Sequence, residues 1–321
     1  MRRIILLAVT ACAGSIGLAG CASGPSQVNA AAIVGNTVIS VDTVQQELTT
    51  ILNAQAQART DQQQGTLDTV SRMIVGERVT HQLVLAAQQR ERLTVDQQQV
   101  DQAIASSGGA DAVAKQLTYD PAAVNDLAYD SVAEESLARA YADRLSVTFD
   151  YVALTNRTDA VNTAHQLAAN PDSFPSVLTA AKQAGGSGQV GQAYSLADVF
   201  ASAAQNEANN QQPYNDYPLF GVAAGTVVVY QRQQGGPWTV AVVRQRDIVP
   251  ATPATTAGHA AANADAQTLV NVGTALLQPI ASQLGVRISP RYGVWDPVSV
   301  TVVASADQAL GVEIPVRTVR S

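Results

Sequence analysis

Residues 31–48 read AAIVGNTVISVDTVQQEL, and this stretch decides how the fold begins. Two short apolar runs flank the pair Gly35 and Asn36, a dipeptide typical of a tight turn, which predicts two short β segments. Either Ser40 or Asp42 is then a candidate N-cap for a helix. Apolar residues follow at i, i+4, i+7 and i+8, the spacing of one helical face. They are Val44, Leu48, Ile51 and Leu52.

Further helices are predicted as far as about residue 145. Leu67 opens one that runs towards Arg92. Thr94, followed three residues later by Gln97, forms a capping-box pattern that predicts a shorter helix. Asp120 then provides a cap followed by Pro121, which predicts the start of a long helix. The first part of the chain is therefore expected to be mostly helical.

This order, together with RLTVDQQQVDQAI at residues 92–104, resembles the N-terminal domain of SurA/PrsA-type foldases. In that family a small-residue β segment leads into helix one, and an x-Val-Thr-Asp-x-Glu-Val pattern opens a later helix. Leu93, Thr94, Val95, Asp96 and Val100 match the second pattern. The resemblance implies a helical chaperone-like domain over residues 30–146.

The N-terminus has the pattern of a secretory signal. Arg2 and Arg3 precede an apolar run that is too short to span a bilayer comfortably. The run ends in Leu-Ala-Gly-Cys, which resembles a bacterial lipobox and implies lipidation at Cys21. We expect a lipoprotein signal peptide at 1–20, a small polar tether at 21–29 and a location on the extracytoplasmic face of the cell membrane. The alternative is an ordinary secretory signal that happens to end near a cysteine.

Composition limits the possible functions. A length of 321 residues favours two domains. A formal net charge of −7 offers no broad basic surface, so nucleic acid is not an expected partner. Only Cys12 and Cys21 are present, which leaves no thiol for a disulfide, a nucleophile or a sulfur-based metal site after processing. No cofactor is expected.

A change of periodicity at Val147 predicts a second domain over residues 147–249. A strand is followed by two helices, a glycine loop at 185–191, the segment Phe220–Thr226, and a hairpin that turns at Gly235 and Gly236. This order resembles a parvulin-type rotamase domain. That family has a histidine on its first and last strands, whereas these positions here are Asp150 or Tyr151 and the region of Trp238. We expect a degenerate parvulin-like domain without isomerase activity, and an α/β domain of another kind remains the alternative.

The last part of the chain begins with a linker at 250–257. An Ala-rich helix over about 257–284 and a following strand resemble the C-terminal segment that completes the N-terminal domain in SurA/PrsA-type proteins, which assigns residues 258–297. The tail, 298–321, has no predicted partner. The predicted fold class is α+β, a helical N-terminal and C-terminal chaperone-like domain with an inserted, small parvulin-like α/β domain.

No catalytic or metal-ligating constellation stands out. The three histidines are far apart in sequence and lack ligand spacing, so each is expected to be isolated. Charged residues on the long helix are expected to form a solvated face. The histidines are His81, His165 and His259, and the charged residues are Glu134, Glu135, Asp126, Asp130, Arg139 and Asp143.

Four aromatic residues are candidate peptide contacts: Tyr151, Trp238, Tyr292 and Trp295. The alternative for the last two is packing of the returning strand against the N-terminal helices.

Three functions are compatible with these features. The first is a membrane-anchored chaperone that binds unfolded or partly folded secreted polypeptides without catalytic residues. The second is an active peptidyl-prolyl isomerase in which Asp150, Tyr151 or Ser195 substitutes for the family groups. The third is a non-catalytic scaffold subunit of a cell-envelope complex.

Overall fold

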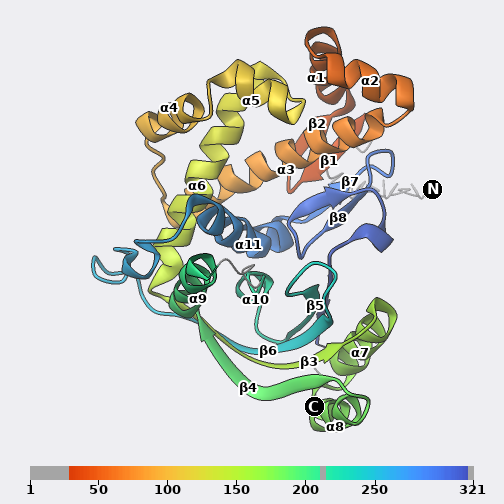
Figure 1. Ribbon diagram of the computed structural model, residues 1–321, viewed down its shortest axis with the longest axis vertical. Helices are drawn as coiled ribbons and strands as arrows, with labels where there is room; N and C mark the ends of the chain where they lie inside the picture. Colours follow the sequence, from red (N-terminus) through yellow and green to blue (C-terminus); the bar gives the residue numbers. More distant parts are fainter. Residues whose placement is uncertain (1–28, 210–214, 317–321) are drawn as a thin grey trace, which may run out of the picture.

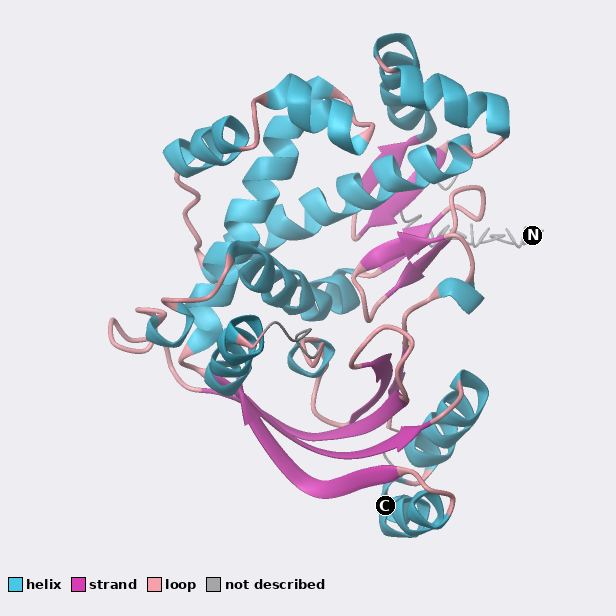
Figure 2. Cartoon of the chain, viewed as in Figure 1, coloured by secondary structure: helices cyan, strands magenta, loops and turns pink. Residues whose placement is uncertain are grey.

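The computed structural model describes residues 29–209 and 215–316. The predicted signal peptide, Cys21 and residues 22–28 of the tether lie outside the described residues. Figure 2 shows that helices gather in the upper part of the molecule and that a curved sheet forms its lower part. All strand pairs are antiparallel among the described residues. The predicted α+β class is confirmed.

The opening stretch folds as its pattern predicts. β1 (Ala30–Val34) and β2 (Thr37–Ser40) pair around Gly35, which has a φ of 58° that favours glycine. Ser40, the first of the two candidate caps, accepts a hydrogen bond from the Thr43 amide at 3.0 Å. This bond satisfies a free amide at the start of α1 (Val41–Ala54), so the turn and the cap together set the direction of the first helix.

The N-terminal helices continue along the upper part of the molecule (Figure 1). They are α2 (Ala56–Gln64), α3 (Leu67–Glu91), α4 (Gln97–Ser106), α5 (Ala110–Leu117), the 3-10 turn η1 (Pro121–Ala123) and α6 (Val124–Ala142). The expected capping box at Thr94 is wrong, because the cap of α4 is Asp96, whose carboxylate accepts from the Gln98 amide at 2.9 Å. Asp120 caps η1 as its position before a proline predicts.

The C-terminal segment returns to this helical layer. β7 (Val286–Ile288) pairs with β1, with Ala32 opposite Ile288, in a sheet of order β2-β1-β7. The preceding helix, α11 (Ala266–Leu284), starts later than the predicted residue 257. Asp265 fixes this start by accepting hydrogen bonds from the amide and the hydroxyl of Thr268. The short turn η3 (His259–Ala261) comes before it.

A helical proline and a glycine shape the contact between α11 and α10 (Pro218–Gly221). Pro279 has no amide proton and cannot complete the helical hydrogen bond to the carbonyl of Ala275. At Gly221, a Cβ would lie 2.4 Å from that carbonyl oxygen, so only glycine allows this approach. The two helices therefore pack where the hydrogen-bond ladder of α11 is interrupted.

The lower sheet has the order β10-β5-β6-β3-β4. α7 and α8 cover one face, while α9 and α10 lie between the other face and α11 (Figure 1). The strands are β3 (Leu145–Leu154), β4 (Ser187–Ser195), β5 (Thr226–Gln231), β6 (Trp238–Ile248) and β10 (Val312–Pro315). The helices are α7 (Arg157–Ala169), the 3-10 turn η2 (Pro171–Ser173), α8 (Phe174–Gln183) and α9 (Leu196–Ala208).

The predicted glycine loop at 185–191 is wrong, because most of it belongs to strand β4. At Gly188 a Cβ would lie 2.4 Å from the carbonyl oxygen of Tyr151 and 2.7 Å from the Leu178 side chain. Glycine here therefore permits close packing of an edge strand against β3 and α8, where the sequence pattern indicates only a flexible connection.

The tail, 298–321, had no predicted partner, and it contributes one strand to each of two sheets. Its first strand, β9 (Thr301–Val303), pairs with the preceding strand β8 (Val294–Asp296) in a separate two-stranded sheet. After the 3-10 turn η4 (Ala306–Gln308), β10 adds to the edge of β5, and Glu313 on β10 accepts a hydrogen bond from Gln278 on α11. Within residues 29–209 and 215–316, no helix combines the length and apolar character needed to cross a membrane.

The crossing of α6 and α11 predicts a large difference between two helical glycines. A Cβ on Gly273 would lie 2.2 Å from the Glu134 carbonyl oxygen, so Gly273→Ala should lower the free energy of unfolding by about 2 kcal/mol or more. In α3, the nearest atom to a Cβ on Gly76 is the Thr301 hydroxyl at 3.8 Å. Gly76→Ala should therefore raise stability by about 0.5 kcal/mol through helix propensity. Urea unfolding of both variants tests this, and equal effects would contradict the crossing.

Candidate functional site

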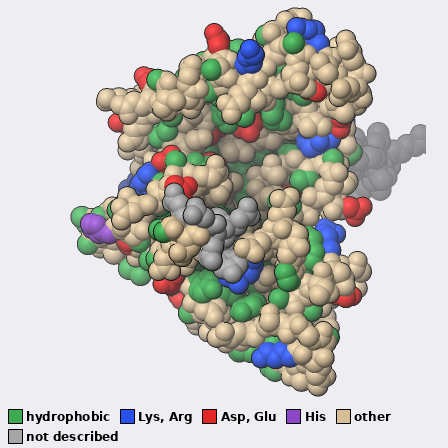
Figure 3. All heavy atoms as spheres, in the orientation of Figure 1, with side chains coloured by type: hydrophobic (Ala, Val, Ile, Leu, Met, Phe, Trp, Pro, Cys, Tyr) green, Lys and Arg blue, Asp and Glu red, His purple; other side chains and the backbone are tan. Residues whose placement is uncertain are grey.

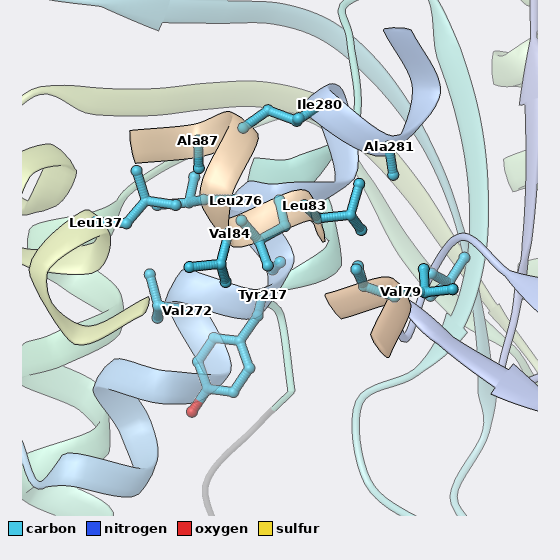
Figure 4. Close-up of a cluster of buried hydrophobic side chains, with 14 of the residues drawn as sticks. Val79, Leu83, Val84, Ala87, Leu137, Tyr217, Val272, Leu276, Ile280 and Ala281 are labelled. Atoms are coloured by element: carbon cyan, nitrogen blue, oxygen red, sulfur yellow. The ribbon is translucent and has the colours of Figure 1, made fainter. Parts of the chain in front are cut away.

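An apolar cluster joins α3, α6 and α11 (Figure 4). Val79 and Leu83 from α3 belong to this cluster with Leu137 from α6 and Leu276 from α11, and all four are buried. The ring of Tyr217 lies beside the cluster, with its hydroxyl pointing away from the apolar side chains. The N-terminal helices thus share one core with a helix from the end of the chain.

Acidic side chains lie beside this cluster, which corrects the predicted solvated face of α6. Asp130 and Glu134 are only 4% and 5% exposed, although Glu135 is partly exposed and pairs with Arg139 as predicted for a solvated helix face. Burial raises the pKa of Glu134 to about 8 and that of Glu77 on α3 to about 7. The helical domain therefore contains carboxyl groups that hold protons near neutral pH.

The hydrogen bond to Glu134 acts against the effect of burial. The Thr274 hydroxyl on α11 lies 3.1 Å from Oε1 of Glu134 and 2.9 Å from the carbonyl oxygen of Val270. A hydroxyl has one proton to donate, and a carbonyl can only accept it. This proton is shared between Val270 and Glu134, and its donation to Glu134 favours the charged carboxylate and so lowers the pKa of Glu134. Burial has the larger effect, so the pKa of Glu134 is still raised to about 8.

The sequence analysis predicted that His81 is isolated, and this prediction is wrong. Its Nδ1 lies 2.8 Å from Oδ1 of the buried Asp130, and this hydrogen bond raises the pKa of His81. Beside it, Arg78 donates to Glu47 at 2.7 Å and to Asp126 at 3.0 Å. These ion pairs therefore tie α1, α3 and α6 together at one place.

The protonated acids predict a stability that falls with rising pH. The folded state binds the Glu134 proton more tightly than the unfolded chain, so the contribution is complete below pH 4.5 and is lost as the pH rises through about 8. Glu77 contributes with the same sign up to about pH 7. Glu134→Gln keeps the hydrogen bond to Thr274 without the charge. It should raise the free energy of unfolding at about pH 9 by on the order of 3 kcal/mol, with little effect in acid.

The matched control is the neighbouring Glu135→Gln, which removes only a partly exposed pair with Arg139. It should change stability by less than about 1 kcal/mol at either pH. Thermal or urea unfolding as a function of pH measures both variants. A pH profile of Glu134→Gln that matches the wild type would show that Glu134 is ionised in the folded protein.

A cavity of about 630 Å³ lies between α11, the hairpin of β5 and β6, and the segment after β8. α11 contributes Asn271, Thr274 and Ala275, the hairpin contributes residues 230–234, and the later segment contributes residues 298–300 and Leu310. Thr274 therefore lines the cavity and also contacts Glu134. This volume lies within the range of pockets that bind small molecules or short peptide segments.

One buried carboxylate orders the wall of this cavity. Asp296 is fully buried and accepts hydrogen bonds from the Val298 amide at 3.0 Å, the Ser299 hydroxyl at 2.6 Å and the Leu310 amide at 2.7 Å. Charge-assisted bonds of this kind are stronger than neutral ones. They hold the two parts of the wall, which are separated by β9 and η4, against each other.

The structure does not bring the four predicted peptide-contact residues together. Tyr151 on β3 packs towards the shared core, whereas Trp238 on β6 packs on the opposite face of the sheet with α7 and α8. Tyr292 is 3% exposed, and the carbonyl oxygen of this residue accepts from Arg72 on α3. Trp295 on β8 is partly buried against the same core. Tyr292 and Trp295 therefore lie where the alternative interpretation placed them, in the returning segment packed against the N-terminal helices.

The polar groups considered as substitutes for parvulin histidines have structural partners. Asp150 is buried, and its carboxylate accepts from the Arg244 guanidinium and from the Gly191 amide, both at 2.7 Å. The Ser195 hydroxyl donates to Asp198 at 2.7 Å in the first turn of α9. These contacts hold β3, β4 and β6 together and shape the start of α9.

Sequence reasoning missed Glu134 and Asp296 as buried acids and Glu77 as a partly buried one. A usable signal exists for Glu134, since Asp130, Glu134 and Leu137 follow the i, i+4, i+7 spacing of one buried face. For Asp296 the signal is the Asp-Pro-x-Ser pattern typical of a side-chain-capped turn. Within the described ranges, no group of three or more histidine, cysteine or acidic side chains is placed to hold a metal ion.

Comparison with known families identifies the first part of the chain. Residues 1–116 match the family model described as SurA-like N-terminal domain. This part of the chain is therefore a SurA-like N-terminal domain, as the resemblance of its opening stretch implied, and the domain suggests a chaperone-like role. No curated protein matches the chain.

Proposed function

We propose that the protein is a chaperone-like lipoprotein, anchored through Cys21 at the extracytoplasmic face of the cell membrane, which binds non-native secreted polypeptides. The observation that carries this proposal is the SurA-like N-terminal domain at residues 1–116. The lipobox-like residues 18–21 support the anchor. A chaperone of this kind needs no catalytic residue, because weak, reversible binding lowers the concentration of free aggregation-prone chain.

The surface chemistry is compatible with this role. Figure 3 shows a face that is hollowed below the uppermost helices, with hydrophobic side chains visible inside the hollow. Charged residues make up only 14% of the chain, and most of the visible surface consists of neutral groups. Neutral polar and apolar groups contact the backbone and side chains of many sequences, as a client-independent chaperone requires.

The second domain fits the proposal as a degenerate parvulin-like unit that binds rather than catalyses. The order of β3, α7, α8 and the closing hairpin of β5 and β6 supports the likeness. The position considered equivalent to the first-strand family histidine is Asp150 or Tyr151, and Asp150 is held by Arg244. In this proposal the domain acts as a spacer and an additional wall for bound polypeptide.

Binding of unfolded protein tests the chaperone. The chain from Ala22 onward, which contains every described residue, should bind reduced, carboxymethylated lactalbumin and should not bind the native, disulfide-bonded form of the same protein. It should also delay aggregation of a denatured client in a light-scattering assay. Equal binding to both forms, or no binding to either, would reject the proposal. A Gly273→Ala variant tested below its unfolding temperature shows whether the intact crossing of α6 and α11 is needed.

The anchor has a separate test. Cys21→Ala removes the only sulfur that a lipid could modify at the predicted cleavage site. The expected result is that the protein moves from the detergent-soluble membrane fraction to the medium or periplasmic fraction, and that labelling with a palmitate analogue is lost. Cys12→Ala is the matched control and should leave both unchanged. Membrane association and labelling that persist in Cys21→Ala would exclude this lipidation site.

A further inference from the structure

We propose that the cavity between α11, the hairpin of β5 and β6, and the segment after β8 binds an uncharged, extended segment of a non-native polypeptide. This inference rests on the proposed chaperone function and gives that function a defined site. The cavity has a volume of about 630 Å³, and Asn215, Tyr217 and Pro218 at the start of α10 line it together with the three parts of the chain named above. A site of this kind forms only in the fully folded protein.

The charges of the lining favour a neutral ligand. Among the described residues that line the cavity, Arg232 has the only charged side chain. Its guanidinium donates to both carboxylate oxygens of the buried Asp216, at 2.8 and 2.6 Å. This bidentate ion pair neutralises the positive charge of Arg232 where the cavity wall meets α10. A charged ligand would therefore lose its hydration in the cavity without gaining a partner of opposite charge.

The remaining lining matches the chemistry of a peptide. Amide side chains come from Gln233 and Gln234 in the hairpin and from Asn271 on α11. Each amide group can both donate to a carbonyl and accept from an N–H, as the backbone of an extended chain requires. Val298, Val300 and Leu310 also line the cavity, and Leu310 provides most of their exposed apolar surface. Amide and apolar groups together favour a polypeptide segment over a charged metabolite or an anion.

The apolar wall is rigid before any ligand binds. Asp296 holds Val298, Ser299 and Leu310 through the hydrogen bonds described above. Val300 has a φ of 52°, an unfavourable conformation for a β-branched residue. Strain of this kind persists only where the surroundings enforce it, and it is found at binding and catalytic sites. A rigid wall lowers the entropy lost on binding.

Leu310 indicates which part of the wall a ligand covers. It is 56% exposed, although its amide is fixed by Asp296. A rigidly held, exposed leucine at the rim of a neutral cavity offers apolar area that a bound side chain can remove from water. We therefore expect an apolar residue of the client to lie on Leu310.

The first experiment measures affinity with defined peptides. Fluorescence anisotropy of the chain from Ala22 is recorded with a short, end-blocked peptide of Val, Ala, Gln and Thr, and with the same peptide carrying Glu or Lys at alternate positions. The uncharged peptide should bind more tightly than both charged ones. Leu310→Asp should weaken binding of the uncharged peptide by about tenfold or more, because it replaces apolar contact with a charge that binding would desolvate. Leu117→Asp, the same change at a leucine of α5 that is 44% exposed, should leave the affinity unchanged.

The outcomes separate the site from the function. If the wild type binds unfolded lactalbumin and Leu310→Asp binds the peptide with wild-type affinity, the chaperone function stands and this cavity is not its site. A loss of affinity in Leu117→Asp instead would move the site to the helical domain and overturn the inference. If the wild type binds neither probe, both the function and the site are rejected.

A second measurement does not depend on a variant that weakens binding. The chain from Ala22 contains no cysteine, so Gln234→Cys and, as a control on α7, His165→Cys each provide one attachment point for a benzophenone cross-linker. Illumination should cross-link the uncharged peptide to the label at position 234 and not to the label at position 165. Equal cross-linking at both positions, or none at position 234 under conditions where the peptide binds, would contradict the proposal.

Discussion

The close crossing of α11 over α6 is the constraint on which the rest of the structure depends. At Gly273 the backbones approach so closely that no side chain fits against the carbonyl of Glu134. This approach lets a helix from the end of the chain complete the core formed by α3 and α6, and it places β7 beside β1. A close approach at a glycine lets apolar side chains on either side of the crossing interdigitate.

The next residue of α11 connects this crossing to the sheet. Thr274 contacts Glu134 on one side and lines the cavity on the other, so a single turn of helix borders the helical core, a buried acid and the space above the hairpin of β5 and β6. The neutral form of Glu134 suits this position, because a charge there would be buried with only one hydroxyl to solvate it. The geometry of the helical domain and the shape of the cavity are thus set by the same few atoms.

Sequence reasoning predicted the parts of the fold that local chemistry controls. The Gly35 turn, the Ser40 cap and the change to a strand near Val147 follow from residues close in sequence. Sequence reasoning failed where contacts between distant segments determine whether a residue is buried or belongs to a strand. Glutamate is a residue type that usually faces solvent, but Glu134 is buried because α11 covers it. Gly188 belongs to a strand because Tyr151 of the neighbouring strand lies against it. The cavity could not be predicted, since its walls come from segments that local patterns do not relate to one another.

The final strands have a consequence for how the chain reaches its native state. β7 closes the sheet begun by β1, and β10 adds to the edge of the sheet that contains β3. Each sheet therefore lacks a strand until the last part of the polypeptide has been made. A chain that leaves the ribosome N-terminus first therefore remains incompletely folded until β7 and β10 have emerged. Cooperative folding of both sheets therefore depends on segments that are made after residue 285.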